Sequence, residues 1–543
     1  MSDGVRLKTQ IWIPKSNVNI EEKNEIFPVI FTRTCYAHQE EEMNIRAEGL
    51  CQRGYAFILQ WCRGCAGSEG LWEPNIHERQ DGLDTLSWIC RQPFAGEIGY
   101  WGDSYLAMAG WCMADAVPDK VKSMYLGVFG TDRYTSMYKD GLFRQDLFTS
   151  WAMDNAGVDI RADYLESCRF RPQILVDRKL WSTNLPWYRE WIMNTDRNSE
   201  YWSGGGIWKM MREIPQKTRI PIFIREGWYD HHLGSAVETF QRLSAENRSK
   251  CVFEIGPWRH DYSVNLEHQP TDRLENDSVQ SPLEWFEYTL KGRGTCNPGV
   301  RMYVIGADRW IHLDNLQPSL KNIRFHFSGK KQRGAFTSYA LISDIDIGRY
   351  RAEQCTRISY IYDPNNPVWS HGAESLFKTR EEIGSLSQPT CSYRDDVISF
   401  VSEPLEKDII TVGVIHVRLY VSSDAEDTAF SCKLMEEFED GDTVNVRGTI
   451  TTLAYRNDSP VRITYISSSI VEINMDFWPI AWRFCKRSKL RIDISSSDFP
   501  QYAIHTNYPG IWSVQEKSRK AEQSLYFGEE YDSVMDFPIL LEE

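Results

Sequence analysis

Short apolar runs alternate with helix-like segments over the first 130 residues. One segment, ERQDGLDTLSWICRQ (78–92), has apolar positions at helical spacing, and residues 105–116 suit a second helix that ends before Pro118. The apolar runs have the length of buried strands and are FPVIFTRT (27–34), YAFILQW (55–61), EIGYWG (97–102) and VKSMYLGVFG (121–130). This alternation predicts an α/β fold, with a mostly parallel sheet covered by helices on both faces.

The pattern changes from about residue 138 to 217. This stretch is rich in Trp, Arg and Met, lacks strand alternation, and contains helix-like pieces such as DLFTSWAMDNAG and WYREWIM. Strand-like runs resume at IPIFIREG (220–227) and KCVFEIG (250–256). We therefore expect a helical cap inserted over the edge of the sheet.

Beyond about residue 325 the helix signals nearly vanish. Largely period-two alternation marks VGVIHVRLYVSS (412–423), TVNVRGTITTLAY (443–455) and LRIDISSS (490–497), which is typical of an antiparallel sandwich or jelly roll. Asp440 and Asp442 resemble a fragment of a calcium loop, but the ligand spacing is incomplete, so a hairpin turn is the better interpretation.

These patterns predict four segments. They are a first part of an α/β-hydrolase core (1–137), a helical cap (138–217), a second part of the core (218–324) and a C-terminal β-sandwich (325–543). A chain of 543 residues is long enough for more than one hydrophobic core.

Composition and charge exclude several classes of partner. The net charge is −15 and no segment concentrates Lys and Arg, which argues against nucleic acid or an anionic membrane as the main partner. The first residues lack a signal-peptide pattern, and no apolar run reaches the length of a membrane span. The thirteen cysteines follow no framework, so we expect reduced, mostly buried thiols in a cytoplasmic protein. Cys62 and Cys65 have redox or metal spacing, but no second pair accompanies them.

One serine stands at a position that suits a nucleophile. In GYWGDSYLAMAGW (99–111), Ser104 follows a predicted strand and precedes a predicted helix. Serine is also a favoured helix N-cap, so the position alone does not separate the two roles. A nucleophilic serine needs a neighbouring base, and the base needs a group that orients it.

A base and its orienting acid occur after two later predicted strands. Asp230 follows IPIFIREG and His260 follows KCVFEIG, which gives the chain order Ser, Asp, His of α/β-hydrolases. Functional groups of open α/β sheets gather at such strand ends. The less favoured rivals are Asp103, which the turn aims elsewhere, and two histidines without a strand-end loop of their own, His231 and His232. Asp261 is interpreted as a solvated neighbour.

The oxyanion of an acyl-transfer intermediate needs two hydrogen-bond donors. The backbone N–H of Tyr105, at the start of the predicted helix, is one candidate. The hydroxyl of Tyr36, in the loop after the strand at 27–34, is the other.

These residues resemble the motifs of the CocE/NonD hydrolases, a family of serine hydrolases that includes esterases, α-amino-acid ester hydrolases, acylases and the core of X-Pro dipeptidyl-peptidases. The similar segments are Arg33-Thr34-Cys35-Tyr36, Gly102-Asp103-Ser104-Tyr105-Leu106, Gly227-Trp228-Tyr229-Asp230, Gly256-Pro257-Trp258-Arg259-His260, YDPNNPV (362–368) and SSSDFP (495–500). The resemblance extends over essentially the whole chain.

The resemblance implies an α/β-hydrolase core, an inserted helical cap and a C-terminal jelly roll. It assigns Ser104 as nucleophile, His260 as base and Asp230 as its partner, with Tyr36 and the Tyr105 amide as oxyanion hole. Three residues depart from common patterns: Cys35 stands where the family usually has Pro, Trp61 where it commonly has Asp, and Leu106 replaces the second Gly of G-x-S-x-G, as in similar family members.

The sequence thus predicts a serine esterase or amidase that acts on a small acyl compound. Acyl transfer or cyclisation in a biosynthetic pathway uses the same acyl-enzyme and stays open as an alternative. An X-Pro dipeptidyl-peptidase is less favoured, because the hydrolase pattern begins at the first residues. A non-catalytic binding module is the remaining class. We expect a small-molecule acyl substrate, no metal or nucleotide cofactor, no nucleic-acid or membrane partner, and a possible homo-oligomer.

Overall fold

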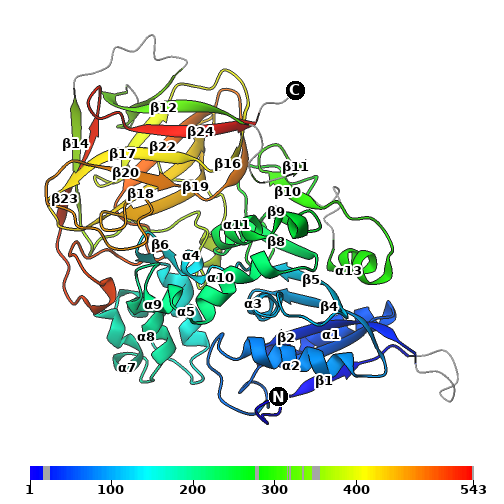
Figure 1. Cartoon of the computed structure of the whole chain (residues 1–543). Coiled ribbons are helices and arrows are strands. Elements are labelled where there is room, and N and C mark those ends of the chain that lie inside the picture. The colour runs from blue at the N-terminus through cyan, green and yellow to red at the C-terminus, as the bar shows by residue number, and fades with distance from the viewer. Residues whose placement is uncertain are drawn as a thin grey trace.

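A nine-stranded sheet forms the half of the molecule that contains both predicted core segments (Figure 1). The computed structural model describes residues 1–15, 25–274, 281–314, 316, 320–332, 336–344 and 355–540. The strand order is β1-β3-β2-β4-β5-β8-β9-β10-β11, and all neighbours are parallel except the two outermost pairs, β1–β3 and β10–β11. The strands are β1 (Thr9–Trp12), β2 (Phe27–Thr34), β3 (Ala56–Trp61), β4 (Ala95–Asp103), β5 (Val121–Gly127), β8 (Ile222–Tyr229), β9 (Val252–Arg259), β10 (Gly299–Val304) and β11 (Arg309–Leu313).

Helices pack against both faces of this sheet. A Cβ on Gly99 of β4 would meet Phe286 of α13, whereas the ring of the next residue, Tyr100, lies against Gly110 of α3. Successive strand residues point to opposite faces, so α3 and α13 cover opposite sides. The helices around the sheet are α1 (Glu40–Gln52), α2 (Glu78–Cys90), α3 (Tyr105–Trp111), α11 (Leu233–Arg242), α12 (Ala245–Arg248) and α13 (Pro282–Lys291), with the 3-10 helix η1 (Ala37–Gln39) ahead of α1. The predicted parallel sheet with helices on both faces is confirmed.

A helical segment lies between β5 and β8 in the chain. In Figure 1 it lies beneath the molecule's other large sheet, which has thirteen strands and is described below. It has its own cluster of buried aromatic side chains, which includes Phe148, Trp191 and Trp208. Its helices are α4 (Arg133–Met137), α5 (Gln145–Asp154), α6 (Tyr164–Arg169), η2 (Gln173–Leu175), α7 (Val176–Lys179), α8 (Pro186–Met193), α9 (Glu200–Ser203) and α10 (Ile207–Lys217). A short hairpin, β6 (Tyr138–Lys139) with β7 (Leu142–Phe143), interrupts it, so the expectation of no strands is wrong at that point.

A thirteen-stranded sheet forms the other half of the molecule. Its pairs are antiparallel except β13–β15, and between α13 and the end of the described chain only 3-10 helices occur among the described residues. The elements are β12 (Leu320–Lys331), β13 (Tyr339–Ser343), β14 (Thr356–Tyr362), η4 (Arg380–Glu382), β15 (Ile398–Ser402), β16 (Ile409–Gly413), β17 (His416–Ser423), β18 (Ala429–Glu437), β19 (Thr443–Thr452), β20 (Val471–Asp476), β21 (Ile480–Phe484), β22 (Lys489–Ser495), η5 (Trp512–Val514), β23 (Ala521–Phe527) and β24 (Val534–Leu540).

Several local predictions are confirmed and others need correction. The turn at Asp440–Asp442 joins β18 to β19 as a hairpin, with the Asp442 amide donating to Asp440 Oδ1. The helix predicted over 105–116 ends at Trp111, and the amides of Met113, Ala114 and Ala116 bond three rather than four residues back. The run 412–423 is divided between β16 and β17. All thirteen cysteines are free, but most are partly exposed rather than buried.

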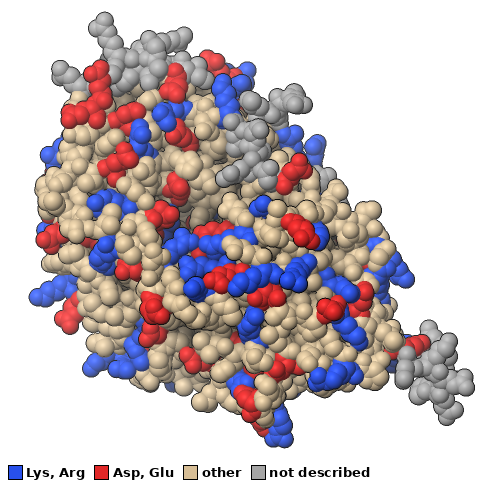
Figure 2. Space-filling model, in the orientation of Figure 1, with Lys and Arg blue, Asp and Glu red and all other residues tan. Residues whose placement is uncertain are grey.

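Charged side chains of both signs lie side by side on the face drawn in Figure 2. This arrangement agrees with the lack of any Lys- and Arg-rich segment in the sequence. Within the described ranges, no helix has both the length and the apolar character needed to cross a membrane.

Candidate active site

The predicted site residues meet at one edge of the first sheet. Tyr36 lies just past β2, Ser104 past β4, Asp230 past β8 and His260 past β9. These four strands run parallel, so their carboxyl ends lie at the same edge. Residues that are up to 224 positions apart in the chain are brought together in this way by the sheet topology.

Ser104 occupies a strained turn between β4 and α3. Its φ is 56° and its ψ is −123°, a region that non-glycine residues rarely occupy. A Cβ on Gly102 would lie 2.4 Å from the Leu106 backbone, so a glycine is required for this close approach. Ser104 is the N-cap of α3, but its side chain makes no capping hydrogen bond. The hydroxyl is therefore available for another partner.

That partner is His260. The distance between Ser104 Oγ and His260 Nε2 is 2.9 Å, and His260 Nδ1 lies 2.6 Å from Asp230 Oδ2. Asp230 is fully buried, and its other oxygen accepts the His232 amide at 2.6 Å. Burial raises the pKa of Asp230, but the interaction with His260 and the hydrogen bond from the His232 amide outweigh this effect and hold the pKa below its usual value. A carboxylate at Asp230 that accepts from Nδ1 leaves Nε2 free to accept the serine proton.

The rival residues have other partners. Asp103 accepts a hydrogen bond from the Tyr262 hydroxyl at 2.6 Å, and His232 Nδ1 lies 2.7 Å from Ser136 Oγ. The His231 ring is 4.5 Å from the His260 ring. Burial lowers the pKa of His231 and His232, which keeps both neutral. Asp261, predicted to be a solvated neighbour, is exposed and also pairs with Arg259 at 3.0 Å.

One group of side chains at this site has the spacing of potential metal ligands. The ligand atoms of Asp230, His231 and His260 lie within 4.8 Å of one another, a set drawn from the described residues. Both nitrogens of His260 and both oxygens of Asp230 already take part in the hydrogen bonds given above. The set therefore fits a proton relay better than a metal centre.

Tyr36 is oriented by a tryptophan that the sequence analysis did not select. Trp151 Nε1, from α5, donates to the Tyr36 hydroxyl oxygen at 3.2 Å. With its oxygen accepting from Trp151, Tyr36 can turn its own proton toward a different acceptor. Burial raises the pKa of Tyr36 well above its usual value, so it stays a donor. No periodicity marks Trp151, since the contact joins α5 to a loop 115 residues earlier.

Tyr105 is fixed by its side chain. Its hydroxyl donates to Glu78 and accepts the Asn75 amide at 2.9 Å, and its ring stacks on Trp151. As the first residue of α3, Tyr105 has a backbone N–H without an intrahelical acceptor. The helix start thus presents a donor beside Ser104.

A cavity of about 1180 Å³ opens onto these residues. It is lined by Ser104, His260 and Tyr36 and by aromatic side chains from the helical segment. The aromatic lining residues include Trp72, Phe129, Phe148, Trp151 and Trp187. A cavity of this size and character accommodates a small organic molecule with apolar parts.

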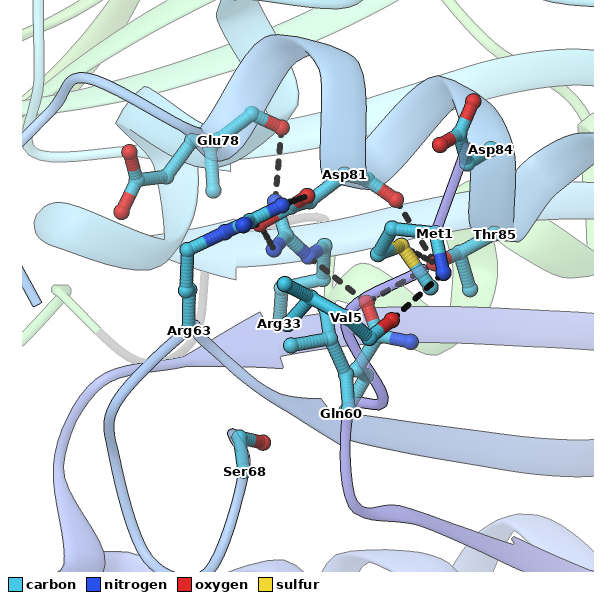
Figure 3. Close-up of polar contacts among 12 residues, drawn as sticks. Met1, Val5, Arg33, Gln60, Arg63, Ser68, Glu78, Asp81, Asp84 and Thr85 are labelled. Atoms are coloured by element: carbon cyan, nitrogen blue, oxygen red, sulfur yellow. Dashed lines mark hydrogen bonds and ion pairs between the residues drawn. The ribbon is translucent and has the colours of Figure 1, made fainter. Parts of the chain in front are cut away.

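A polar cluster around Arg33, Arg63 and Asp81 joins the loop after β3 to α2 (Figure 3). Arg63 makes a bidentate ion pair with Asp81 of α2, at 3.1 and 2.6 Å, and also donates a hydrogen bond to Asp3. Arg33 of β2 donates to Gln60 at 3.0 Å and to the Glu78 carbonyl at 2.6 Å. Glu78 in turn accepts from Tyr105, which connects this cluster to the start of α3.

The departures noted in the sequence fall around this cluster. Trp61, where the family commonly has Asp, is buried with Lys8 Nζ 4.2 Å from its ring centroid. Cys35 lines the cavity beside Tyr36. Cys62 and Cys65 are both free, and burial raises the pKa of each thiol, which suits inert rather than redox-active cysteines.

Two family models match the chain in succession. Residues 3–262 match the X-Pro dipeptidyl-peptidase (S15 family), and residues 295–536 match the X-Pro dipeptidyl-peptidase C-terminal non-catalytic domain. The first match contains the strands that carry Ser104, Asp230 and His260, and the second covers most of the thirteen-stranded sheet.

Similar proteins share the full length. Cocaine esterase from Rhodococcus sp. (strain MB1 Bresler) is 25% identical over 99% of this chain and 97% of its own. An aminopeptidase from a marine sediment Thaumarchaeota archaeon has a similar structure, with a TM-score of 0.81, 19% identity and coverage of 100% and 95% of the two chains. An α-amino acid ester hydrolase gives a TM-score of 0.80 at 18% identity, covering 99% of this chain and 95% of that one. The two structures establish a shared hydrolase fold with a C-terminal β domain.

Proposed function

We propose that the chain is a serine hydrolase of the CocE/NonD type and that it cleaves an ester or amide of a small acyl compound through an acyl-enzyme on Ser104. One observation carries the proposal. Ser104 Oγ, the His260 ring and the Asp230 carboxylate form a continuous hydrogen-bonded series with distances of 2.9 and 2.6 Å.

Acylation begins when Ser104 Oγ attacks the substrate carbonyl carbon and its proton passes to His260 Nε2. The carbonyl π electrons move to oxygen and form a tetrahedral oxyanion. Buried Asp230 stabilises the imidazolium through Nδ1–H without taking the proton itself. Collapse of the intermediate breaks the bond to the alcohol or amine, which leaves with the proton from Nε2.

The oxyanion receives hydrogen bonds from the Tyr36 hydroxyl and the Tyr105 amide. The bond from Trp151 to Tyr36 supports this role, since it sets the direction in which Tyr36 donates. A donor fixed before the reaction stabilises developing charge without reorganisation.

Deacylation repeats these steps with water as the nucleophile. His260 Nε2 removes a proton from water, the hydroxyl adds to the acyl carbon, and Ser104 Oγ leaves with the proton. Every proton in this scheme moves through His260, so the proposal invokes no cofactor. An alcohol or amine in place of water gives acyl transfer by the same steps, and the ratio of transfer to hydrolysis with added nucleophiles decides between them.

We assign the segments as the sequence predicts them. Residues 138–217 act as a cap, which is supported by the aromatic side chains that α5 and α8 contribute to the cavity. The residues from 325 onward act as a jelly roll that braces the core. The bond from Arg447 of β19 to the Trp228 carbonyl, two residues before Asp230, supports this bracing role.

An X-Pro dipeptidyl-peptidase is the second candidate, because the matching family model carries that name. Such an enzyme must bind the ammonium group of a peptide. Three of the cavity aspartates are already paired with a cation: Asp154 with Lys378 at 2.7 Å, Asp159 with Arg161 at 3.1 Å and Asp261 with Arg259 at 3.0 Å. The fourth, Asp103, accepts from the Tyr262 hydroxyl. This pairing favours the esterase. Rapid release of a chromophore from Gly-Pro or Ala-Pro amides would reverse the order.

The proposal is tested by labelling with a fluorophosphonate probe. We expect stoichiometric labelling of the native protein, loss of labelling in Ser104→Ala, and a fall in p-nitrophenyl ester turnover of about 10³-fold or more. Ser87→Ala, which changes an exposed serine on α2, is the matched control and keeps both properties. A folded native protein that neither labels nor turns over any ester, amino-acid ester or peptide amide refutes the proposal.

A further inference from the structure

One cavity residue has a charge that the proposed mechanism does not use. Arg133, the first residue of α4, lines the same cavity as Ser104 and is only 7% exposed. The preceding residue, Asp132, is the nearest carboxylate in the chain, but it binds Arg197 at 2.9 Å and Arg242 at 3.3 Å. Asp132 is therefore engaged elsewhere and is not the counter-ion of Arg133.

The guanidinium of Arg133 lies among aromatic rings instead of acids. Its centre is 4.7 Å from the ring centroid of Phe148, 5.4 Å from that of Trp191 and 5.9 Å from that of Trp208. The Nε atom is buried without a hydrogen-bond partner in the described structure. Burial lowers the pKa of Arg133 to about 10, so the group remains a cation at neutral pH.

Other charged residues of the cavity wall are satisfied. Arg259 pairs with Asp261 at 3.0 Å, and Arg380 donates to the Phe377 carbonyl at 3.2 Å. Asp154 pairs with Lys378. In the described part of the wall, Arg133 has neither an ion pair nor a hydrogen bond. A buried cation in that state is costly unless an anion reaches it.

The position of Arg133 relates it to the reacting groups. Arg133 lines the same cavity as Tyr36 and Tyr105, the two residues assigned to the oxyanion hole. Phe148, under the guanidinium, also contacts the His231 ring, which lies against His260. The guanidinium is thus on the cavity wall next to the place where a substrate carbonyl would react.

We propose that Arg133 binds a carboxylate of the substrate, so that the enzyme prefers esters or amides that carry an anionic group. This inference rests on the proposed hydrolase function for its meaning in catalysis. The planar fork of an arginine matches a carboxylate with two parallel hydrogen bonds, and the aromatic walls exclude competing water. The overall charge of −15 repels anions at long range, so a preference for them has to arise locally.

Matched substrate pairs test this preference. The first pair is mono-(4-nitrophenyl) glutarate and its methyl ester, with the charge on the acyl part. The second is 4-acetoxybenzoate and its methyl ester, with the charge on the leaving part. In at least one pair we expect kcat/KM of the native enzyme to favour the anion by about 10-fold or more, the effect of a hydrogen bond to a charged group.

Three variants assign the preference to Arg133. R133M should lose the preference while it keeps turnover of the methyl esters, and R133K should retain part of it because the charge remains. K209M removes the same charge from an exposed position on α10 and should leave the preference unchanged. If the native enzyme favours the methyl ester in both pairs, or R133M slows both members of a pair equally, the inference is wrong.

A binding measurement separates this inference from the hydrolase proposal. In the S104A background, 4-nitrobenzoate and neutral 4-nitrobenzamide are titrated while quenching of tryptophan fluorescence is followed, since Trp72 and Trp151 line the cavity. We expect tighter binding of the benzoate by about 10-fold, lost in S104A/R133M. If Ser104 is not labelled but this dependence on Arg133 persists, the hydrolase proposal fails and the anion site stands. Equal binding of the two compounds overturns the anion site.

Discussion

Two regions of the molecule each bury an arginine, and the groups that surround the two guanidinium charges differ. Below the cavity, Arg63 is paired with Asp81 and Asp3, and these partners raise its pKa. In the helical segment, Arg133 faces aromatic rings and burial lowers its pKa. The first arrangement stabilises the charged form of the side chain, and the second destabilises it.

This difference distinguishes an arginine that stabilises the fold from an arginine that is available to bind a ligand. A guanidinium that is paired with carboxylates of the protein, as in Arg63, holds α2 to the loop at 62–72. An unpaired one at a cavity wall keeps its binding capacity at a cost in stability. The helical segment contains another buried ionisable group without an ion pair in the described structure, Asp146 of α5, whose carboxyl accepts hydrogen bonds from Ser150 and the Phe377 amide.

The largest effect is expected when the paired region is broken. Asp81→Asn removes the carboxylate that Arg33 and Arg63 share and leaves Arg63 only its contact with the exposed Asp3, so we expect a loss of about 3–5 kcal/mol in the free energy of unfolding. Thermal melting and chemical denaturation measure it. Asp119→Asn, at an exposed position, is the control and should melt with the native protein. A D81N protein that melts with this control would show that the cluster does not stabilise the core.

The same contrast explains how far sequence reasoning reaches. Ser104, Asp230 and His260 follow apolar runs whose type and order are local properties, so their place at one sheet edge could be predicted. Trp151 and Arg133 could not be selected, because their roles depend on how helices without strand-like periodicity pack over a loop more than 90 residues away in the chain.

The second largest effect tests whether the helical segment carries unbalanced charge. Burial raises the pKa of Asp146 to about 6 from 3.8, so the folded state holds its proton more tightly than the unfolded state. Stability from this group is complete below pH 3.8 and is lost as pH rises to about 6. Asp146→Asn mimics the protonated form and should avoid that loss, by about 1–3 kcal/mol at pH 7.

Melting temperatures between pH 4.5 and 7.5 measure this effect. The difference between D146N and the native protein should grow as pH rises and level off above pH 6. Asp154→Asn, an exposed neighbour on α5 paired with Lys378, should show no such growth. If the difference in melting temperature between D146N and the native protein does not change with pH, the Asp146 carboxylate is not destabilised in the folded state and the prediction is wrong.

A smaller effect on stability is expected at Arg133. Arg133→Met removes an unpaired cation and keeps apolar bulk against Phe148 and Trp191, so we expect stability to change by less than about 1 kcal/mol or to rise. Chemical denaturation beside D81N gives the direct comparison of the two regions. Destabilisation of R133M as large as that of D81N would show that aromatic rings balance a buried guanidinium as well as carboxylates do.

The last effect concerns the hydrogen bond from Trp151 by which the helical segment reaches the proposed oxyanion hole. Trp151→Phe keeps an aromatic ring against Tyr105 but removes the donor to Tyr36, which frees the tyrosine hydroxyl to turn. A neutral hydrogen bond contributes about 1 kcal/mol, so kcat should fall about 5-fold with KM nearly unchanged. Trp187→Phe makes the same change at a neighbouring ring, 6.0 Å from Trp151 and on the same cavity wall, and should alter KM more than kcat. Equal kcat values in the two variants would mean that Tyr36 is held by its own loop and that the helical segment contributes shape, not orientation, to the reaction.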